Sequence, residues 1–70
     1  MFYDESIPLP PHTPKILLED DRVLKEYYDK GDWISFDMYV EGVETTIKSC
    51  HLTGKLTRSE ALQIMRRYGI

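Results

Sequence analysis

Cys50, His51 and His12 are the residues best suited to covalent or metal chemistry. On a helix, neighbouring side chains point about 100° apart, so Cys50 and His51 cannot share a proton as a nucleophile and its base. We expect Cys50 to fill the core and His51 to flank it. A zinc site needs a larger cluster of histidine and cysteine ligands. The sequence therefore predicts no catalytic residue, no metal site and no bound cofactor, and we expect that the chain is not an enzyme.

A row of carboxylates is the other candidate for metal binding. If residues 33–53 are helical, Asp37, Glu41 and Glu44 share one face and could hold a hard cation weakly. A solvated acidic face explains the same spacing. Phosphate binding has no support, because the chain contains neither GxxxxGK[ST] nor GxGxxG. The four glycines fall instead at expected element ends or at a helix kink: Gly31, Gly42, Gly54 and Gly69.

The charge of the chain is divided between its two parts. Residues 1–46 hold eleven acidic and four basic side chains, whereas residues 47–70 hold one acidic and five basic side chains, which gives a net charge of −3. The two parts could face each other in the fold, or one part could attract a charged partner. The basic part favours nucleic acid, but the excess of acidic residues upstream opposes phosphate binding.

Residues 1–15 are predicted to form an extended arm, followed by a single small helical domain over residues 16–70. All the prolines lie in this arm: Pro8, Pro10, Pro11 and Pro14. Each proline removes a backbone donor and fixes its own φ, so we expect no helix there. The spacing of Pro11 and Pro14 matches a PxxP ligand, although such spacing is common. Apolar residues suggest that part of the arm packs on the core: Phe2, Tyr3, Ile7 and Leu9.

The first helix is predicted over residues 20–30. Apolar and aromatic residues share one helical face there: Val23, Leu24, Tyr27 and Tyr28. Gly31 can adopt the left-handed conformation that ends a helix. Asp32 can then cap whatever element follows.

Residues 33–53 fit two templates. At helical spacing, apolar residues recur three and four apart through the whole segment: Trp33, Phe36, Val40, Val43, Ile47 and Cys50. At strand spacing, apolar residues alternate with polar ones only as far as Gly42: Ile34, Phe36, Met38 and Val40. Because the helical pattern continues beyond Gly42, we favour a helix, with an interruption at Gly42 left open. The alternative is an α+β fold with a β-hairpin at residues 33–50.

Residues 51–70 carry the clearest local signals. Gly54 can end a helix, Thr57 and Glu60 have the spacing of a capping box that begins another, and Gly69 supplies a stop. The segment HLTGKLTRSEALQIMRRYGI resembles the short helical hairpins, of the SHOCT kind, that end many bacterial proteins. The resemblance covers residues 51–70 alone. No function is carried across from it.

Together these elements predict an all-α fold of three helices, with a capped C-terminal helical hairpin and an extended proline-rich arm. A small helical chain without catalytic motifs acts most readily by docking, so we expect a protein-interaction module that binds a partner protein or itself. The residues expected at contacts are Tyr28, Trp33, Arg58, Arg66 and Arg67, because exposed aromatic and arginine side chains are favoured at interfaces. The alternative is a small nucleic-acid-associated regulator that uses the basic hairpin.

The expected location is the cytoplasm, without membrane contact. No apolar run approaches the ~20 residues that cross a bilayer, and the N-terminal residues lack the pattern of a signal peptide. The single cysteine and the absence of asparagine fit a reducing compartment.

Overall fold

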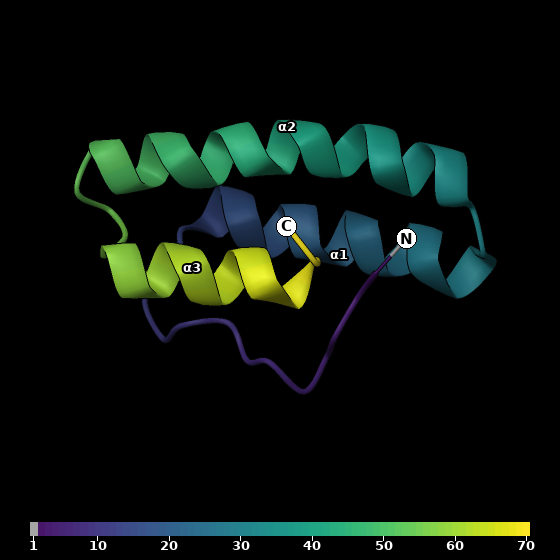
Figure 1. Ribbon diagram of the computed structural model, residues 1–70, viewed down its shortest axis with the longest axis horizontal. Coiled ribbons are helices and arrows are strands. Elements are labelled where there is room, and N and C mark those ends of the chain that lie inside the picture. The colour runs from purple at the N-terminus through teal and green to yellow at the C-terminus, as the bar shows by residue number, and fades with distance from the viewer. Residues whose placement is uncertain (1) are drawn as a thin grey trace.

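Three helices make up the regular structure of residues 2–70, which are the residues that the computed structural model describes. They are α1 (Lys15–Lys30), α2 (Trp33–Leu52) and α3 (Arg58–Arg67). The long helix α2 runs antiparallel to both of the others and packs on each (Figure 1). No strand occurs within the described residues. The all-α prediction is therefore confirmed, and the β-hairpin alternative for residues 33–50 is not observed.

Helix α1 begins five residues earlier than its predicted start at Asp20. Pro14 stands just before the first turn with φ −55° and accepts the backbone N–H groups of Leu17 and Leu18. A proline costs a helix nothing at this end, since the first N–H groups have no intrahelical partner. The prolines thus exclude helix only as far as Pro14, and Lys15 belongs to the helix.

The junction between α1 and α2 follows the predicted chemistry. Gly31 adopts φ 69° and donates its N–H to Tyr28 O at 3.1 Å, which closes α1 in the left-handed region where glycine is unstrained. The Asp32 carboxylate accepts the N–H of Ser35 at 3.1 Å and caps α2. This tight connection makes the two helices antiparallel neighbours.

Helix α2 passes through Gly42 without a break. A Cβ at this position would have no atom within 4 Å, so no neighbouring segment packs closely enough to require a glycine here. Packing of the inner face sustains the helix against the roughly 1 kcal/mol that an interior glycine costs. That inner face buries Phe36, Val43, Ile47 and Cys50.

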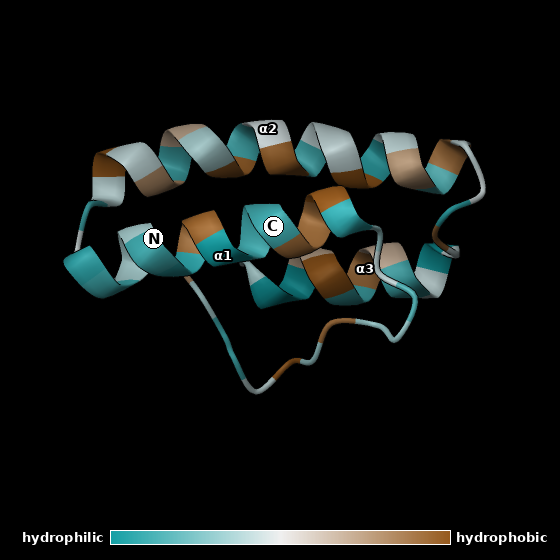
Figure 2. Ribbon diagram, turned by 180° about the vertical axis from the view of Figure 1, so that it is seen from behind, coloured by the Kyte–Doolittle hydropathy of each residue, from teal (hydrophilic) through white to brown (hydrophobic). Residues whose placement is uncertain are grey.

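The core lies where the inner face of α2 meets the other helices. Its remaining residues come from α1, α3, the arm and the turn before α3: Leu17, Leu24, Ala61, Ile64, Tyr68, Tyr3 and Leu56. Figure 2 shows hydrophobic segments of α2 turned toward α1 and α3. Helix α3 begins with the predicted capping box, in which Thr57 Oγ1 accepts the N–H of Glu60 at 3.1 Å and Glu60 Oε1 accepts the N–H of Thr57 at 2.8 Å.

Residues 2–14 follow an irregular path beneath α3 (Figure 1). The N–H of Asp4 donates to Arg67 O at 2.8 Å, and the Gln63 amide donates to Pro8 O. Thr13 is buried and donates its hydroxyl to Pro10 O at 2.6 Å. The arm is therefore tied along much of its length to α3 and to itself.

Candidate interaction surface

Arg67 points into the molecule, not toward a partner, and only 8% of it is exposed. Its Nε donates to Asp21 Oδ1 at 2.9 Å, and its Nη1 donates to Ile7 O at 2.6 Å. Nη2 donates to the Tyr3 hydroxyl at 2.8 Å. Arg67 therefore joins α3 to both α1 and the arm.

Asp21 is the centre of this arrangement, which we call the Asp21 cluster: Tyr3, Asp21, Arg67 and Tyr68. Besides the arginine, its carboxylate accepts the Tyr68 hydroxyl at 2.6 Å and the Tyr3 hydroxyl at 3.1 Å. Within residues 2–70 no buried side-chain nitrogen or oxygen lacks a hydrogen-bond partner. A buried ion pair is stable only when its remaining polar atoms are satisfied in this way.

The proton affinities in the cluster agree with that structural role. Burial raises the pKa of Tyr68 above its usual value, and the hydrogen bond to Asp21 raises that pKa further. The pKa of Tyr3 is also raised, by burial first and then by the negative charge of Asp21. Burial alone lowers the pKa of Arg67, but the hydrogen bond and charge of Asp21 outweigh this effect and raise it. At neutral pH both tyrosines keep their protons and Arg67 its charge.

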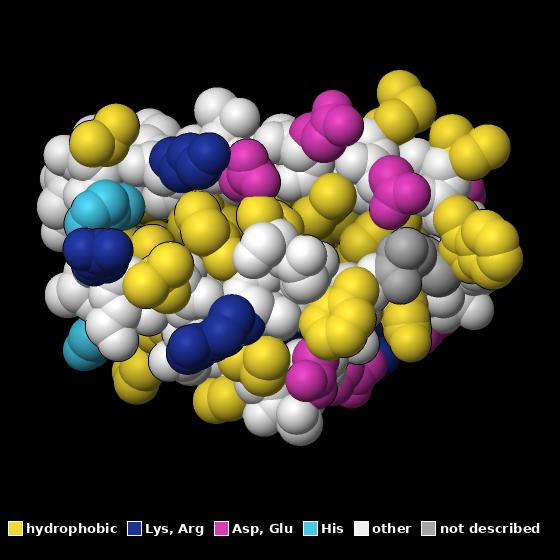
Figure 3. Space-filling view, in the orientation of Figure 1, with side chains coloured by type: hydrophobic (Ala, Val, Ile, Leu, Met, Phe, Trp, Pro, Cys, Tyr) yellow, Lys and Arg dark blue, Asp and Glu magenta, His cyan; other side chains and the backbone are white. Residues whose placement is uncertain are grey.

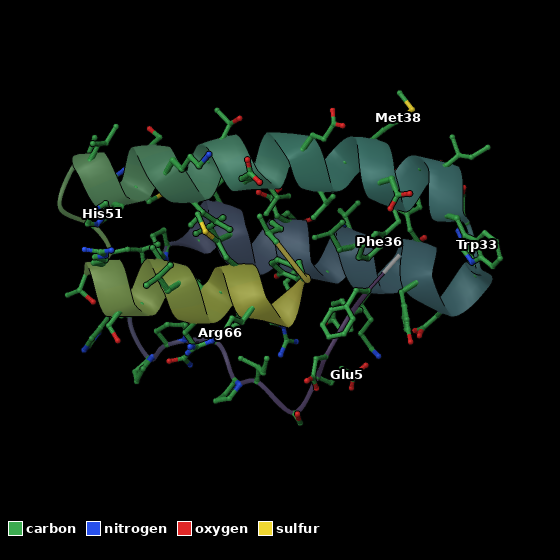
Figure 4. All side chains as sticks on the ribbon, in the orientation of Figure 1. Glu5, Trp33, Phe36, Met38, His51 and Arg66 are labelled. Atoms are coloured by element: carbon green, nitrogen blue, oxygen red, sulfur yellow. The ribbon has the colours of Figure 1, made fainter. Side chains whose placement is uncertain are left out.

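Arg58 and Arg66 lie on the exposed surface of α3. Arg66 extends from the outside of α3 (Figure 4). Within residues 2–70, no hydrogen bond or ion pair engages the side chain of either arginine. Both guanidinium groups are thus accessible from outside, unlike that of Arg67.

Arg58 lines a shallow hollow of about 440 Å³ between the end of α2 and the start of α3. We call it the hairpin groove, and its lining residues are Lys48, His51, Leu52, Arg58, Ala61, Leu62 and Met65. The lining is largely apolar, with the two cationic side chains and His51 among it. Figure 3 shows this combination at one end of the molecule, where dark-blue and cyan side chains surround hydrophobic ones.

The polar side chains that line the groove have different hydrogen-bond partners. Lys48 donates to Glu44 Oε2 at 3.2 Å, an exposed i, i+4 pair on α2. His51 Nδ1 lies 3.2 Å from Leu56 O, and because a carbonyl only accepts, Nδ1 carries the proton. In the neutral ring this leaves His51 Nε2 as an acceptor. Cys50, next to it in the chain, is buried in the core as predicted.

The two aromatic residues predicted at contacts differ in their surroundings. Tyr28 is partly covered, since its ring stacks on Tyr3 with centroids 5.5 Å apart and lies 6.4 Å from Phe36. Trp33 is 66% exposed, although the helical pattern assigned it to the core-facing row. It is the first residue of α2 and lies at the end of that helix (Figure 4).

Trp33 does not stand alone on this part of α2. Ile34 and Met38 are 76% and 72% exposed, and together the three side chains form what we call the α2 patch. Ile34 and Met38 are one turn apart on the same face of the helix. The patch is at the opposite end of α2 from His51 (Figure 4).

Comparison with protein-family models, curated proteins and solved structures finds no match to this chain. The resemblance of residues 51–70 to SHOCT hairpins thus has no family match behind it. Two further findings concern the described residues alone: they include no group of three or more histidine, cysteine or carboxylate side chains placed to hold a metal ion, and no helix long and apolar enough to cross a membrane.

The apolar members of the surface were missed by the sequence reasoning. The sequence analysis named none of Leu52, Leu62 and Met65 as a contact residue, and they come together only because the end of α2 lies beside α3. A signal for Leu62 was available, because it lies one turn from both Arg58 and Arg66 and so shares their outward side of α3. Asp21 had no comparable signal, since its partners lie far from it in the chain.

Proposed function

We propose that this chain is a small protein-interaction module without catalytic activity and that the hairpin groove is its contact surface. The observation that supports this proposal is the groove itself, which combines exposed apolar side chains with cations at its edge. Exposed apolar surface gathered in one hollow gains free energy when a partner removes it from water. Cations at the edge select a partner whose own edge is acidic.

The partner that suits this surface is a protein segment with apolar side chains flanked by carboxylates. The volume of about 440 Å³ accommodates a few side chains and is open to solvent along one side, as a helix or extended segment requires. Leu52, Leu62 and Met65 would cover the apolar side chains, while Arg58 and His51 Nε2 would meet polar groups at the edge.

Nucleic acid is a weaker alternative on the same surface. Of the five basic residues after residue 46, Arg67 is occupied by Asp21 and Lys48 by Glu44. That leaves Lys55, Arg58 and Arg66, too few for a cationic track along a phosphate backbone. The apolar lining also has no role in such a contact.

A capture experiment with a matched pair of variants tests the proposal. Leu62→Glu places a carboxylate in the groove, whereas Leu18→Glu places one on α1, at a leucine of nearly the same exposure, 48% against 46%. Each tagged variant and the wild type would be incubated with host lysate, half of it treated with nuclease, and bound proteins read by mass spectrometry.

We expect one defined set of proteins to bind the wild type and Leu18→Glu, to survive nuclease, and to be lost with Leu62→Glu. Equal capture by Leu62→Glu would contradict a role for the groove. Capture that disappears with nuclease in all three proteins would instead support the nucleic-acid alternative.

A further inference from the structure

The chain carries on its own surface the kind of segment that the hairpin groove suits. The α2 patch presents two aliphatic side chains and an indole that are each more than half exposed: Trp33, Ile34 and Met38. Ile34 and Met38 have the i, i+4 spacing of neighbouring anchors in helix-in-groove recognition. Burying each of them would remove a large apolar area from water.

The charges around the two surfaces are complementary. Glu41 is exposed on α2 three residues beyond Met38, whereas Arg58 is exposed at the border of the groove. Figure 3 shows magenta carboxylates near the hydrophobic side chains at one end of the molecule and dark-blue cations with cyan histidine at the other. Opposite potentials of this kind steer association and fix its direction.

One molecule cannot bring its own two surfaces together. Helix α2 has 20 residues, which at 1.5 Å per residue places its ends roughly 30 Å apart, and the longest extent of the whole molecule is 33 Å. The patch and the groove lie toward opposite ends of this one rigid element. A patch that enters a groove must therefore come from another molecule.

We propose that the hairpin groove binds the α2 patch of a second copy of this chain, in a head-to-tail arrangement. This inference rests on the proposed function, because it names the partner of the same groove. In such a contact each copy uses two different surfaces, so the free patch of one copy and the free groove of the other can each add a further copy. The assembly grows as an open chain unless its rotation closes a ring.

Two measurements on the wild-type protein test whether copies associate. Sedimentation at rising concentration should show an increasing average mass, and added salt should reduce it because exposed charges contribute to the contact. Trp33 is the single tryptophan, so its emission should move to shorter wavelength over the same concentration range. A monomer with unchanged emission up to millimolar concentration at low salt would overturn the inference.

Complementation by two variants tests the head-to-tail geometry. Ile34→Glu disables the patch and leaves the groove, whereas Leu62→Glu disables the groove and leaves the patch. Both should fold, because a glutamate in the first turn of α2 suits the helix dipole and one at position 62 lies one turn from Arg58 and Arg66. Circular dichroism and melting curves check this, with Leu18→Glu as the control that should assemble like the wild type.

Each variant alone should associate at least tenfold more weakly than the wild type. Mixed in equal amounts, they should form a heterodimer that grows no further, since only one intact patch and one intact groove face each other. A heterodimer smaller in amount than either homodimer, or a Leu62→Glu variant that still self-associates, would overturn the head-to-tail contact. Loss of lysate capture by Leu62→Glu together with a monomeric wild type would leave the proposed function standing and remove only this inference.

Discussion

Helix α3 begins and ends with an arginine, and the two side chains lie in opposite environments. Arg67 is buried and fully bonded in the Asp21 cluster, whereas Arg58 is exposed at the edge of the hairpin groove. They border the apolar face of α3 on its two sides. One side meets α1 and the arm, which supply a carboxylate and a tyrosine hydroxyl. The other side meets the end of α2, where the nearby carboxylate of Glu44 is already paired with Lys48.

This difference shows that the basic residues of the segment 47–70 do not all lie on one exposed surface. Identical residue types within one short helix serve two purposes, and which purpose each serves depends on the segments that pack beside it. The arginine at the end of α3 is buried in contacts within the fold, whereas the arginine at its start is exposed, and our proposal assigns it to recognition. Three substitutions test this division, beginning with the one of largest expected effect.

Asp21→Asn should destabilise the protein by about 3 to 5 kcal/mol, because the amide leaves the buried Arg67 charge without a counter-charge. Urea denaturation followed by helical circular dichroism measures the change. The matched control is Glu19→Gln, which removes an exposed carboxylate paired with Arg22 on the same helix and should leave stability almost unchanged. If the two variants were equally stable, the Asp21 cluster would not be the structural centre described above.

Tyr68→Phe should cost about 1.5 to 2 kcal/mol at neutral pH, since it removes a hydrogen bond to a charged group. It should also change the response to alkali. The pKa of Tyr68 is raised in the folded state, so below pH ~10 both states hold the proton, and above it the unfolded state alone releases one. The stabilisation by this group is therefore present at neutral pH and lost as pH rises above about 10.

Melting curves of the wild type and Tyr68→Phe between pH 8 and 11 would measure that response. The wild type should lose more stability than Tyr68→Phe over this range, while lysine deprotonation affects both proteins alike. Parallel losses in the two proteins would show that the Tyr68 proton is no more tightly held than in the unfolded chain.

Arg58→Ala should have the smallest effect on stability, within about 0.5 kcal/mol, because the side chain is exposed and at the surface. It should nevertheless weaken lysate capture and self-association. Arg67→Ala at the other end of the helix is the matched comparison and should unfold the protein or destabilise it by several kcal/mol. A large loss of stability in Arg58→Ala would contradict the division between the two arginines.

The parts of the fold that local chemistry decides could be predicted from the sequence. The capping box at Thr57 and Glu60 and the glycine stop at Gly31 depend on residues within a few positions of one another, and both are present. The helical interpretation of residues 33–53 was reached from the length of its apolar pattern, and it is confirmed over Trp33–Leu52. The predicted start of α1 was wrong, because a proline such as Pro14 is compatible both with an extended arm and with the position just before a helix.

The candidate site was less accessible to such reasoning. The burial of Arg67 requires Tyr3, Ile7 and Asp21 to meet around it, and nothing near Arg67 in the sequence indicates them. Trp33 has helical spacing from the buried Phe36 and is nevertheless 66% exposed, so spacing alone does not decide which residues of the row are covered. The hairpin groove likewise exists only once the end of α2 and the start of α3 lie side by side.

The contact between Tyr3 and Arg67 has a consequence for the order of folding. It joins residues 64 positions apart, so almost the whole chain must close as a loop before the bond can form. Helical turns close much shorter loops and can form first, at a lower entropic cost. The arm is thus expected to dock last, and it completes the burial of Arg67 only when both ends of the chain are present. Detachment of the arm from α3 would therefore expose the guanidinium group of Arg67, which is buried in the folded protein.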